Sequence, residues 1–281
     1  MITVLNSGIY SSIQDLGRSG FAHIGVPVSG VMDSYATKIG NQLLHNSLEE
    51  AVIEITFGGC KFLFEKGLQI CLTGANFTPT IDGEKVSMNS VLDVKKGSVL
   101  SFGKKIFGVR TYLSILGGIS SEVVLNSKSF YKGITTSFVL KKGDQIKINS
   151  TTSENKKTLS KIKIEEHNFT AKCINCCKGP EFELLSKTEQ ELLIETQFTI
   201  SNDNNRVGYR LKEVFKNQLK PILTSGVLPG TVQLTPSGEL IILMRDCQVT
   251  GGYPRVLQLT EEAINILAQK TTKDKIQFEL K

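Results

Sequence analysis

Short runs of alternating apolar and polar residues, separated by turn residues, recur along most of the 281-residue chain. From Val109 to Ile115, apolar residues alternate with Arg110, Tyr112 and Ser114, which is the period of a strand with one buried face. The pair Asp82-Gly83 lies between two such runs and favours a type I′ hairpin turn. VKKGSVLSF and LKKGDQIKI repeat one turn followed by one alternating strand. The pattern predicts a mainly β protein.

Helical periodicity is confined to a few short segments. Asp33 can cap a helix that runs to about Leu44, and Thr260 can cap another that begins with two glutamates. Thr188 and Glu191 have the spacing of a capping box before a short helix. The first helix would place on one face Tyr35, Ala36, Ile39, Leu43 and Leu44. These helices are too few for a doubly wound α/β fold, so we expect mainly β structure with a few short helices.

A polar segment divides the chain. Residues 150–161 read STTSENKKTLSK, which is rich in Ser, Thr and Lys and lacks hydrophobic periodicity, as linkers and exposed loops do. We therefore predict an N-terminal β subdomain over residues 1–150 and a C-terminal β subdomain over residues 162–281.

Composition excludes several classes of protein. Hydrophobic residues make up 40% of the chain and charged residues 21%, which supports packed cores. No segment has the roughly 18 unbroken apolar residues of a membrane helix, and the N-terminus does not resemble a signal peptide. With six cysteines and no such leader, reduced thiols in a cytoplasm are the expectation. The net charge of +6 comes from scattered lysines without interleaved aromatic residues, so we expect no nucleic-acid partner and no membrane partner.

The arginines are distributed differently from the lysines. All six lie in glycine-rich or otherwise distinctive segments: Arg18, Arg110, Arg206, Arg210, Arg245 and Arg255. A planar guanidinium suits a carboxylate or phosphate ligand, but it equally suits an internal carboxylate or buried loop carbonyls. Both interpretations stay open at this point.

Three segments concentrate candidate ligand-binding groups. The first, residues 13–36, has five turn-forming Gly and Pro residues and could present Gln14, Asp15, Arg18, His23, Ser29 and Asp33. The second, SNDNNRVGYRL, carries Arg206. The third places a set of polar groups after an apolar strand and around a Gly-Gly turn: Arg245, Asp246, Gln248 and Thr250. The alternatives are a loop that closes the end of a barrel, with Asp33 only a helix cap, and a turn in which Asp246 accepts from backbone amides.

Known cofactor signatures are absent. The sequence has no P-loop, no G-x-S-x-G elbow and no Met-Lys-Met biotinylation site. Cys173, Cys176, Cys177 and His167 are close together, but no second ligand pair follows them, so we expect no metal.

The same segments carry a family resemblance. GIYSSIQDLGRSGFAHIGVPVSGVMDSYA, VRTYLSILGGI, SNDNNRVGYRL, SGVLPGTVQLTPSG and DCQVTGGYP occur in the order found in the carboxyltransferase subunit family that includes the C subunit of 5-oxoprolinase. The resemblance spans nearly the whole chain. Three positions depart from the family pattern. Asn205 replaces an acid, and Val249 replaces a threonine. The family sequence Gly-Ser-Arg-Ser appears here as Asn-Ser-Lys-Ser, from Asn126 with Lys128 in the place of the arginine.

The resemblance implies two cyclophilin-like β-barrel subdomains and a subunit of a cytoplasmic, bacterial, ATP-dependent complex that opens 5-oxoproline to L-glutamate. Its partners would be a small-molecule substrate and two other components of 5-oxoprolinase, the related-fold B component and the separate A component. ATP would be used by the complex, with no covalently bound cofactor. The implied catalytic residues are Asp15, Arg18, Arg206 and Asp246, and the implied substrate-binding residues are Gln14, Ser29, Gln248, Thr250 and Tyr253. Two alternatives are a biotin-dependent carboxyltransferase subunit of the urea or allophanate type, and a non-catalytic partner that binds a kinase-inhibitor subunit.

Overall fold

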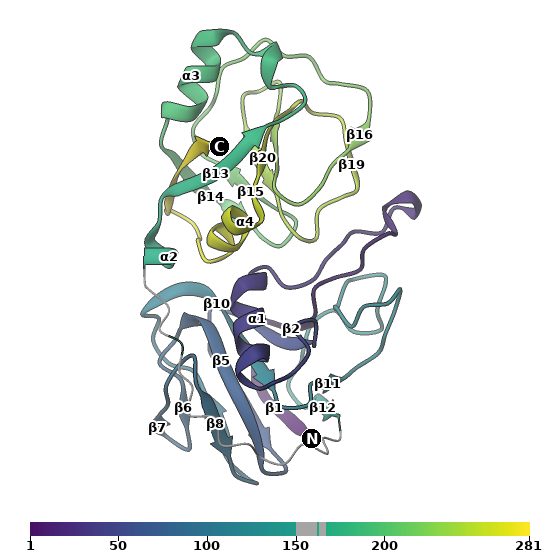
Figure 1. Cartoon of the computed structure of the whole chain (residues 1–281), viewed down its shortest axis with the longest axis vertical. Helices are drawn as coiled ribbons and strands as arrows, with labels where there is room; N and C mark the ends of the chain where they lie inside the picture. The colour runs from purple at the N-terminus through teal and green to yellow at the C-terminus, as the bar shows by residue number, and fades with distance from the viewer. Residues whose placement is uncertain (150–161, 163–166) are drawn as a thin grey trace. The chain divides into compact units, whose positions relative to one another are not determined.

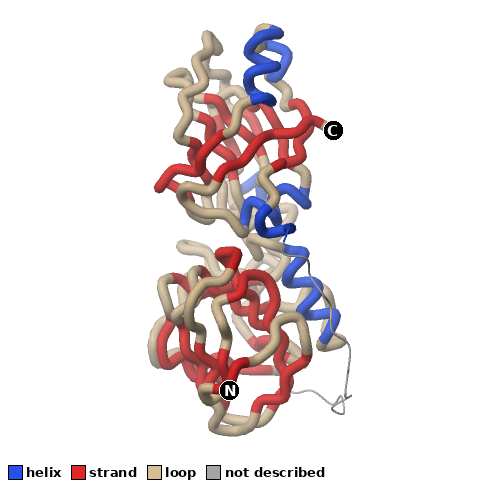
Figure 2. The backbone as a smooth tube through the Cα atoms, turned by 90° about the vertical axis from the view of Figure 1, so that its left-hand side faces the viewer, coloured by secondary structure: helices blue, strands red, loops and turns tan. Residues whose placement is uncertain are grey.

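The computed structural model describes residues 1–149, 162 and 167–281. The chain is mainly β, as predicted, and strands dominate each of its parts (Figure 2). It divides into two compact units. Unit 1 comprises Met1–Arg18 and Ser29–Glu166, and unit 2 comprises Ser19–Val28 and His167–Lys281. No helix in the described part of the chain is long and apolar enough to cross a membrane.

Unit 1 is built from two sheets around one hydrophobic core. The seven-stranded sheet has the order β11-β12-β1-β4-β9-β6-β7, and the five-stranded sheet has the order β2-β3-β10-β5-β8. The elements are β1 Ile2–Ser7, β2 Tyr10–Gln14, α1 Ser34–Leu43, β3 Val52–Thr56, β4 Cys60–Phe64, β5 Leu68–Asn76, β6 Thr80–Ile81, β7 Glu84–Lys85, β8 Val91–Val94, β9 Val99–Ser101, β10 Phe107–Ile115, β11 Ile119–Ser120 and β12 Gln145–Ile148.

Unit 2 contains a closed seven-stranded barrel with the order β13-β20-β17-β18-β15-β14-β21 (Figure 1). A separate two-stranded ribbon pairs β16 with β19. The elements are the 3-10 helix Ala22–Ile24, α2 His167–Thr170, β13 Cys173–Lys178, the 3-10 helix Phe182–Leu184, α3 Lys187–Glu195, β14 Phe198–Asn204, β15 Gly208–Leu211, β16 Ser225–Gly226, β17 Thr231–Leu234, β18 Leu240–Leu243, β19 Thr250–Gly251, β20 Arg255–Leu259, α4 Glu261–Ala268 and β21 Lys275–Leu280.

Helix starts follow the capping signals at two of the three predicted positions. Asp33 accepts a hydrogen bond from Ala36 N at the start of α1, and Thr260 accepts from Ala263 N at the start of α4. The prediction for α3 was displaced by two residues. Ser186 is the cap, and its hydroxyl and backbone exchange hydrogen bonds with Glu189 in a complete capping box.

The structure overturns one further expectation, for Tyr35, and confirms another, for the hairpin at Asp82-Gly83. Tyr35 was predicted on the apolar face of α1, but it is 53% exposed, because this face consists of residues further along the helix. The hairpin at Asp82-Gly83 is confirmed, since both residues have the positive φ of a type I′ turn, 52° and 88°. The predicted linker, residues 150–161, lies outside the described residues.

Strand β10 is buried on both faces, although its alternation predicted one exposed face. One face contributes Leu113 and Ile115 to the core of unit 1. The opposite face carries the polar residues Arg110, Tyr112 and Ser114, and α1 contacts both β10 and β5. The polar face is therefore interior, and its groups must be satisfied within the protein or by a ligand.

Candidate functional site

The predicted site residues lie in both units. Unit 1 holds Gln14, Asp15, Arg18 and Ser29, and unit 2 holds Arg206, Asp246, Gln248, Thr250 and Tyr253. Each group has its own geometry and is considered within its unit.

Asp15 is the centre of a buried polar cluster in unit 1. Its Oδ1 accepts hydrogen bonds from Ser127 Oγ and Ser129 Oγ, both at 2.6 Å, and from Gly17 N at 2.8 Å. Its Oδ2 accepts from Lys128 N at 2.5 Å. One carboxylate thus joins the segment after β2 to residues 127–129, more than 110 residues away along the chain. This arrangement suits a residue that positions two loops.

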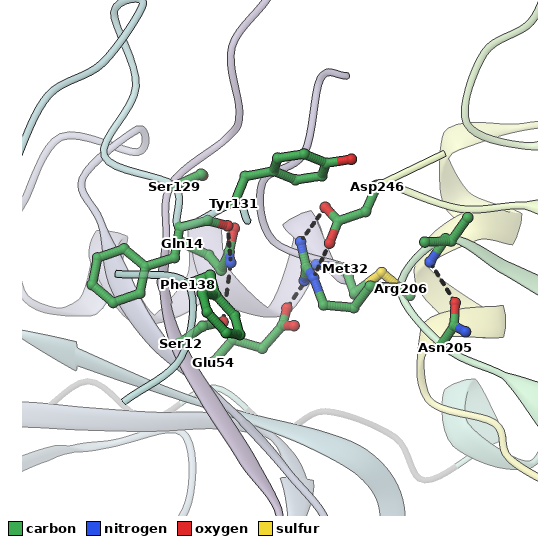
Figure 3. A network of polar contacts seen from close by, with 12 residues as sticks. Ser12, Gln14, Met32, Glu54, Ser129, Tyr131, Phe138, Asn205, Arg206 and Asp246 are labelled. Atoms are coloured by element: carbon green, nitrogen blue, oxygen red, sulfur yellow. Dashed lines mark hydrogen bonds and ion pairs between the residues drawn. The ribbon is translucent and has the colours of Figure 1, made fainter. Parts of the chain in front are cut away.

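The other candidates of unit 1 are also bound to the chain. Arg18 Nη2 donates to the carbonyl oxygen of Ser129, and Gln14 Nε2 donates to Ser12 Oγ at 3.0 Å and Phe130 O at 3.2 Å (Figure 3). Ser29 is 1% exposed and has a left-handed φ of 56°. The structure therefore brings Gln14, Asp15 and Arg18 together onto residues 127–130.

The segment at residues 126–129 explains how two departures from the family pattern are accommodated. Asn126 has a φ of 61°, a left-handed conformation that glycine adopts freely and asparagine tolerates. Lys128 Nζ lies 2.5 Å from Glu50 Oε1, so this cation serves an internal ion pair. Ser127 and Ser129, which keep the family serines, make the contacts with Asp15.

Sequence reasoning missed a second buried network in unit 1. Glu54 is fully buried on β3, and its Oε2 accepts from Met32 N at 2.7 Å (Figure 3). Its Oε1 lies 3.8 Å from Arg110 Nε. The Tyr112 hydroxyl accepts from Asp33 N at 2.8 Å. Burial raises the pKa of Tyr112 well above its ordinary value, and the charges of Glu54 and Asp33 raise it further. The signal for this network was the polar face of the β10 alternation.

Arg206 and Asp246 form a forked ion pair in unit 2. Arg206 Nε lies 2.8 Å from Asp246 Oδ2, and Nη2 lies 2.9 Å from Oδ1 (Figure 3). The Asp246 amide also donates to the Arg206 carbonyl at 2.8 Å. The side chains are 8% and 12% exposed, so water screens the pair weakly. The structure brings these two candidate residues together.

Asn205 shapes the turn that presents Arg206. Its Oδ1 accepts from Val207 N at 2.7 Å and from Gly208 N at 3.3 Å, which is an Asx turn at the start of β15. An aspartate, the residue found here in the family pattern, would offer the same acceptor. The substitution therefore preserves the turn.

The remaining candidates of unit 2 lie beside the ribbon formed by β16 and β19. Thr250 belongs to β19, and Gln248 and Tyr253 flank this strand; all three are exposed. Val227 N donates a hydrogen bond to the Val249 carbonyl oxygen at 3.0 Å, which fixes the backbone at Val249. Because that contact uses the backbone, the replacement of a family threonine by Val249 leaves the pairing intact.

Five of the six arginines are engaged with internal carboxylates. The pairs are Arg110 with Glu54, Arg206 with Asp246, Arg210 with Glu239, Arg245 with Glu261, and Arg255 with Glu181. These five arginines therefore each pair with a carboxylate of the same chain. Among the described residues, no group of three or more His, Cys, Asp and Glu side chains could hold a metal ion.

Comparison with known proteins gives a consistent set of relatives. The family described as the carboxyltransferase domain, subdomain A and B, matches residues 24–280. The chain is 32% identical to the 5-oxoprolinase C subunit of Escherichia coli K12 over 275 residues, covering 96% of this chain and 87% of that protein. It is 30% identical to the 5-oxoprolinase C subunit of Haemophilus influenzae, covering 99% of this chain and 91% of that protein.

A solved structure shares the fold over nearly the whole chain. The crystal structure of the K. lactis urea amidolyase superposes with a TM-score of 0.86 and 27% identity over 99% of this chain. The chain spans 18% of the length of that protein.

Proposed function

Since the chain belongs to the carboxyltransferase domain family, subdomain A and B, we propose that it is a subunit of an ATP-dependent complex that opens 5-oxoproline to L-glutamate. The observation that carries the proposal is its similarity to two 5-oxoprolinase C subunits over nearly their whole length. The complex would include the related-fold B component and the separate A component of 5-oxoprolinase, and it would act in the cytoplasm.

The chemistry of the lactam defines what the site must supply. An amide carbonyl is a poor electrophile, and phosphorylation of its oxygen at the expense of ATP would create a leaving group. The opening step then develops negative charge on oxygen, which fixed cationic donors stabilise. Arg206 supplies such a donor, because its guanidinium is held in one orientation by Asp246.

The two groups of residues have different roles in this proposal. Arg206 and Asp246 act on the substrate, and the exposed side chains of Gln248, Thr250 and Tyr253 are available to bind it. Asp15 and Arg18 hold residues 127–129 in place through the contacts described above. Gln14 supports the same segment through Phe130 O, and Ser29 is buried.

The test measures glutamate released from 5-oxoproline and ATP by this chain assembled with the products of its neighbouring genes. Activity that is lost when the chain is omitted supports the proposal. No glutamate from a complex shown to be assembled contradicts it.

The urea amidolyase similarity favours a second candidate function, carboxyl transfer from carboxybiotin to a urea-like or amide-like acceptor. This candidate requires a biotinylated partner, because the chain has no biotinylation motif. Inhibition of the assembled complex by avidin distinguishes it from the ATP-dependent hydrolysis.

A further inference from the structure

Gln233 is a buried amide in unit 2 that the candidate site does not yet use. It lies on β17 and is 2% exposed. Within the part of the chain that the structure describes, its Nε2 is fully buried and has no hydrogen-bond partner. Buried side-chain donors are nearly always satisfied, so a donor left without an acceptor indicates a water, an ion or a ligand that completes it.

Apolar residues surround much of this amide, and its other cross-strand partner is Arg255 on β20. Gln233 pairs with Ile241 on β18, in register with the strand that leads to Asp246. On its other side lie Gly251 and Val227, and Val227 packs in a small cluster with Leu243 and Cys247. A hydrogen bond from a buried amide to an acceptor is stronger than one in water, because little water competes for the donor.

The ribbon of β16 and β19 covers the amide. A Cβ added to Gly251 would overlap Gln233 Nε2, so only glycine permits this close approach. The ribbon is short, with two residues in each strand. Further bonds join Ile222 N to Gly252 O and Val227 N to Val249 O, both at 3.0 Å, and Arg255 Nη1 to Gly226 O at 3.0 Å. Figure 1 labels β16 and β19 beside one another. A ladder this short can separate from the barrel at low cost, since few hydrogen bonds are lost.

We propose that Gln233 Nε2 donates a hydrogen bond to a carbonyl or carboxylate oxygen of the substrate, and that the β16–β19 ribbon moves to admit that oxygen. The predicted substrate-binding residue Thr250 lies on the same ribbon as Gly251, which places the donor beside that part of the site. This inference rests on the proposed function for the identity of the substrate, a lactam that carries both kinds of oxygen.

The test compares Gln233→Leu with the wild-type chain in the assembled complex. Leucine has a similar size and lacks the donor, so KM for 5-oxoproline should rise about tenfold, the loss expected for one hydrogen bond, with a smaller change in kcat. The melting temperature of the isolated variant should stay the same or rise, because a donor without an acceptor has been removed. A fall in melting temperature with an unchanged KM overturns the inference and assigns the amide to a structural water.

Two further variants keep the test decisive. Gln233→Glu preserves the acceptor and the length of the side chain but removes the donor, so it should raise KM at least as much as leucine does. Gly251→Ala pushes a methyl group against the amide and should raise KM more than Gly226→Ala, where an added Cβ meets nothing within 4 Å. Equal effects of the two alanines contradict the proposed donor.

The outcome also separates this inference from the proposed function. If the wild-type complex releases no glutamate, both are overturned. If it is active and all three of the Gln233 and Gly251 variants keep the wild-type KM, only the inference about Gln233 fails.

Discussion

At the scale of single residues, hydrogen bonds within the chain hold the side chains of the candidate site in place. Asp246 fixes the guanidinium of Arg206 through two hydrogen bonds, and Asp15 fixes residues 127–129 through three acceptor contacts. We propose that the first pair acts on the substrate, whereas the second arrangement holds loops. Substitutions at the two positions should therefore differ in what they impair.

Replacing Arg206 by alanine should lower turnover of the assembled complex by about a hundredfold, the usual loss for one donor to a developing oxyanion. The matched control is Arg210→Ala in the same hairpin. Arg210 and its partner Glu239 are 42% and 36% exposed, so their pair contributes little. Steady-state kinetics of both variants provide the measurement, and equal turnover would remove Arg206 from the site.

Replacing Asp15 by alanine should lower the free energy of unfolding by about 3 kcal/mol, because two buried serine hydroxyls and two amides lose their acceptor. Asp15→Asn keeps one good acceptor and should lose less. Urea denaturation measures both values. A stable Asp15→Asn protein without activity would instead show that this carboxylate takes part in the chemistry.

Asn205→Asp should preserve both the fold and the activity, because the carboxylate can accept from Val207 N and Gly208 N as the amide does. Asn205→Ala removes the acceptor and should cost about 1 kcal/mol, with reduced turnover as Arg206 loses its orientation. Steady-state kinetics of the two variants measure their turnover. A poorly active Asn205→Asp variant would show that the amide itself is needed.

At the scale of elements, α1 is matched to the polar face beneath it. Gly40 lies on the buried side of the helix, and a Cβ there would lie 2.5 Å from Ser114 Oγ and 3.3 Å from Thr73 Oγ1. Glycine in a helix is unfavourable by about 1 kcal/mol relative to alanine, yet here it allows α1 to approach β10 and β5.

Gly40→Ala should therefore destabilise the protein even though alanine favours the helix. The double substitution Gly40→Ala with Ser114→Ala should recover part of the loss, since it removes the nearest atom. Thermal unfolding of the two single variants and the double variant forms a cycle that isolates the coupling. Additive effects would mean that the helix moves away from the sheet instead of meeting Ser114.

The capping signals show how far local sequence determines these elements. Asp33 and Thr260 were predicted correctly as helix caps. Near α3, Ser186 with Glu189 and Thr188 with Glu191 have the same spacing, and local sequence cannot choose between them. The structure chooses Ser186.

The candidate site was predictable only in part. Dense segments of Gly, Arg and Asp identified Arg206, Asp246 and Asp15, but not their partners. Ser127 lies 112 residues from Asp15, and Glu54 lies 56 residues from Arg110, so chain folding alone brings these groups together. Gln233 gave no signal, because a glutamine in an apolar strand resembles any other buried polar position.

At the scale of the whole molecule, long-range ion pairs connect separate parts of unit 2. Glu181 accepts from the Arg255 backbone amide, Nε and Nη2, while Arg255 Nη1 donates to Gly226 O on the ribbon. The hydrogen bonds from Arg255 lower the pKa of Glu181 below its ordinary value of 4.5. This contact joins the segment after β13, strand β20 and the ribbon.

The lowered pKa of Glu181 makes the stability of the protein depend on pH. Its contribution is fully present above about pH 4.5, the ordinary value for this carboxyl, and is lost as the pH falls through the lower folded-state pKa. The difference in free energy of unfolding between wild type and Glu181→Gln should therefore be larger at neutral pH than at about pH 3. A difference that is constant over this range would mean that the ion pair does not contribute.

The closure of the barrel in unit 2 sets the order in which this part of the protein can form during translation. Strand β21 pairs on one side with β13 and on the other with β14, so it fills the gap between two strands that lie far earlier in the chain. Until β21 leaves the ribosome, β13 and β14 each expose an unpaired edge that invites pairing with another chain. A chain in which β21 has not yet formed thus exposes two strand edges that favour aggregation.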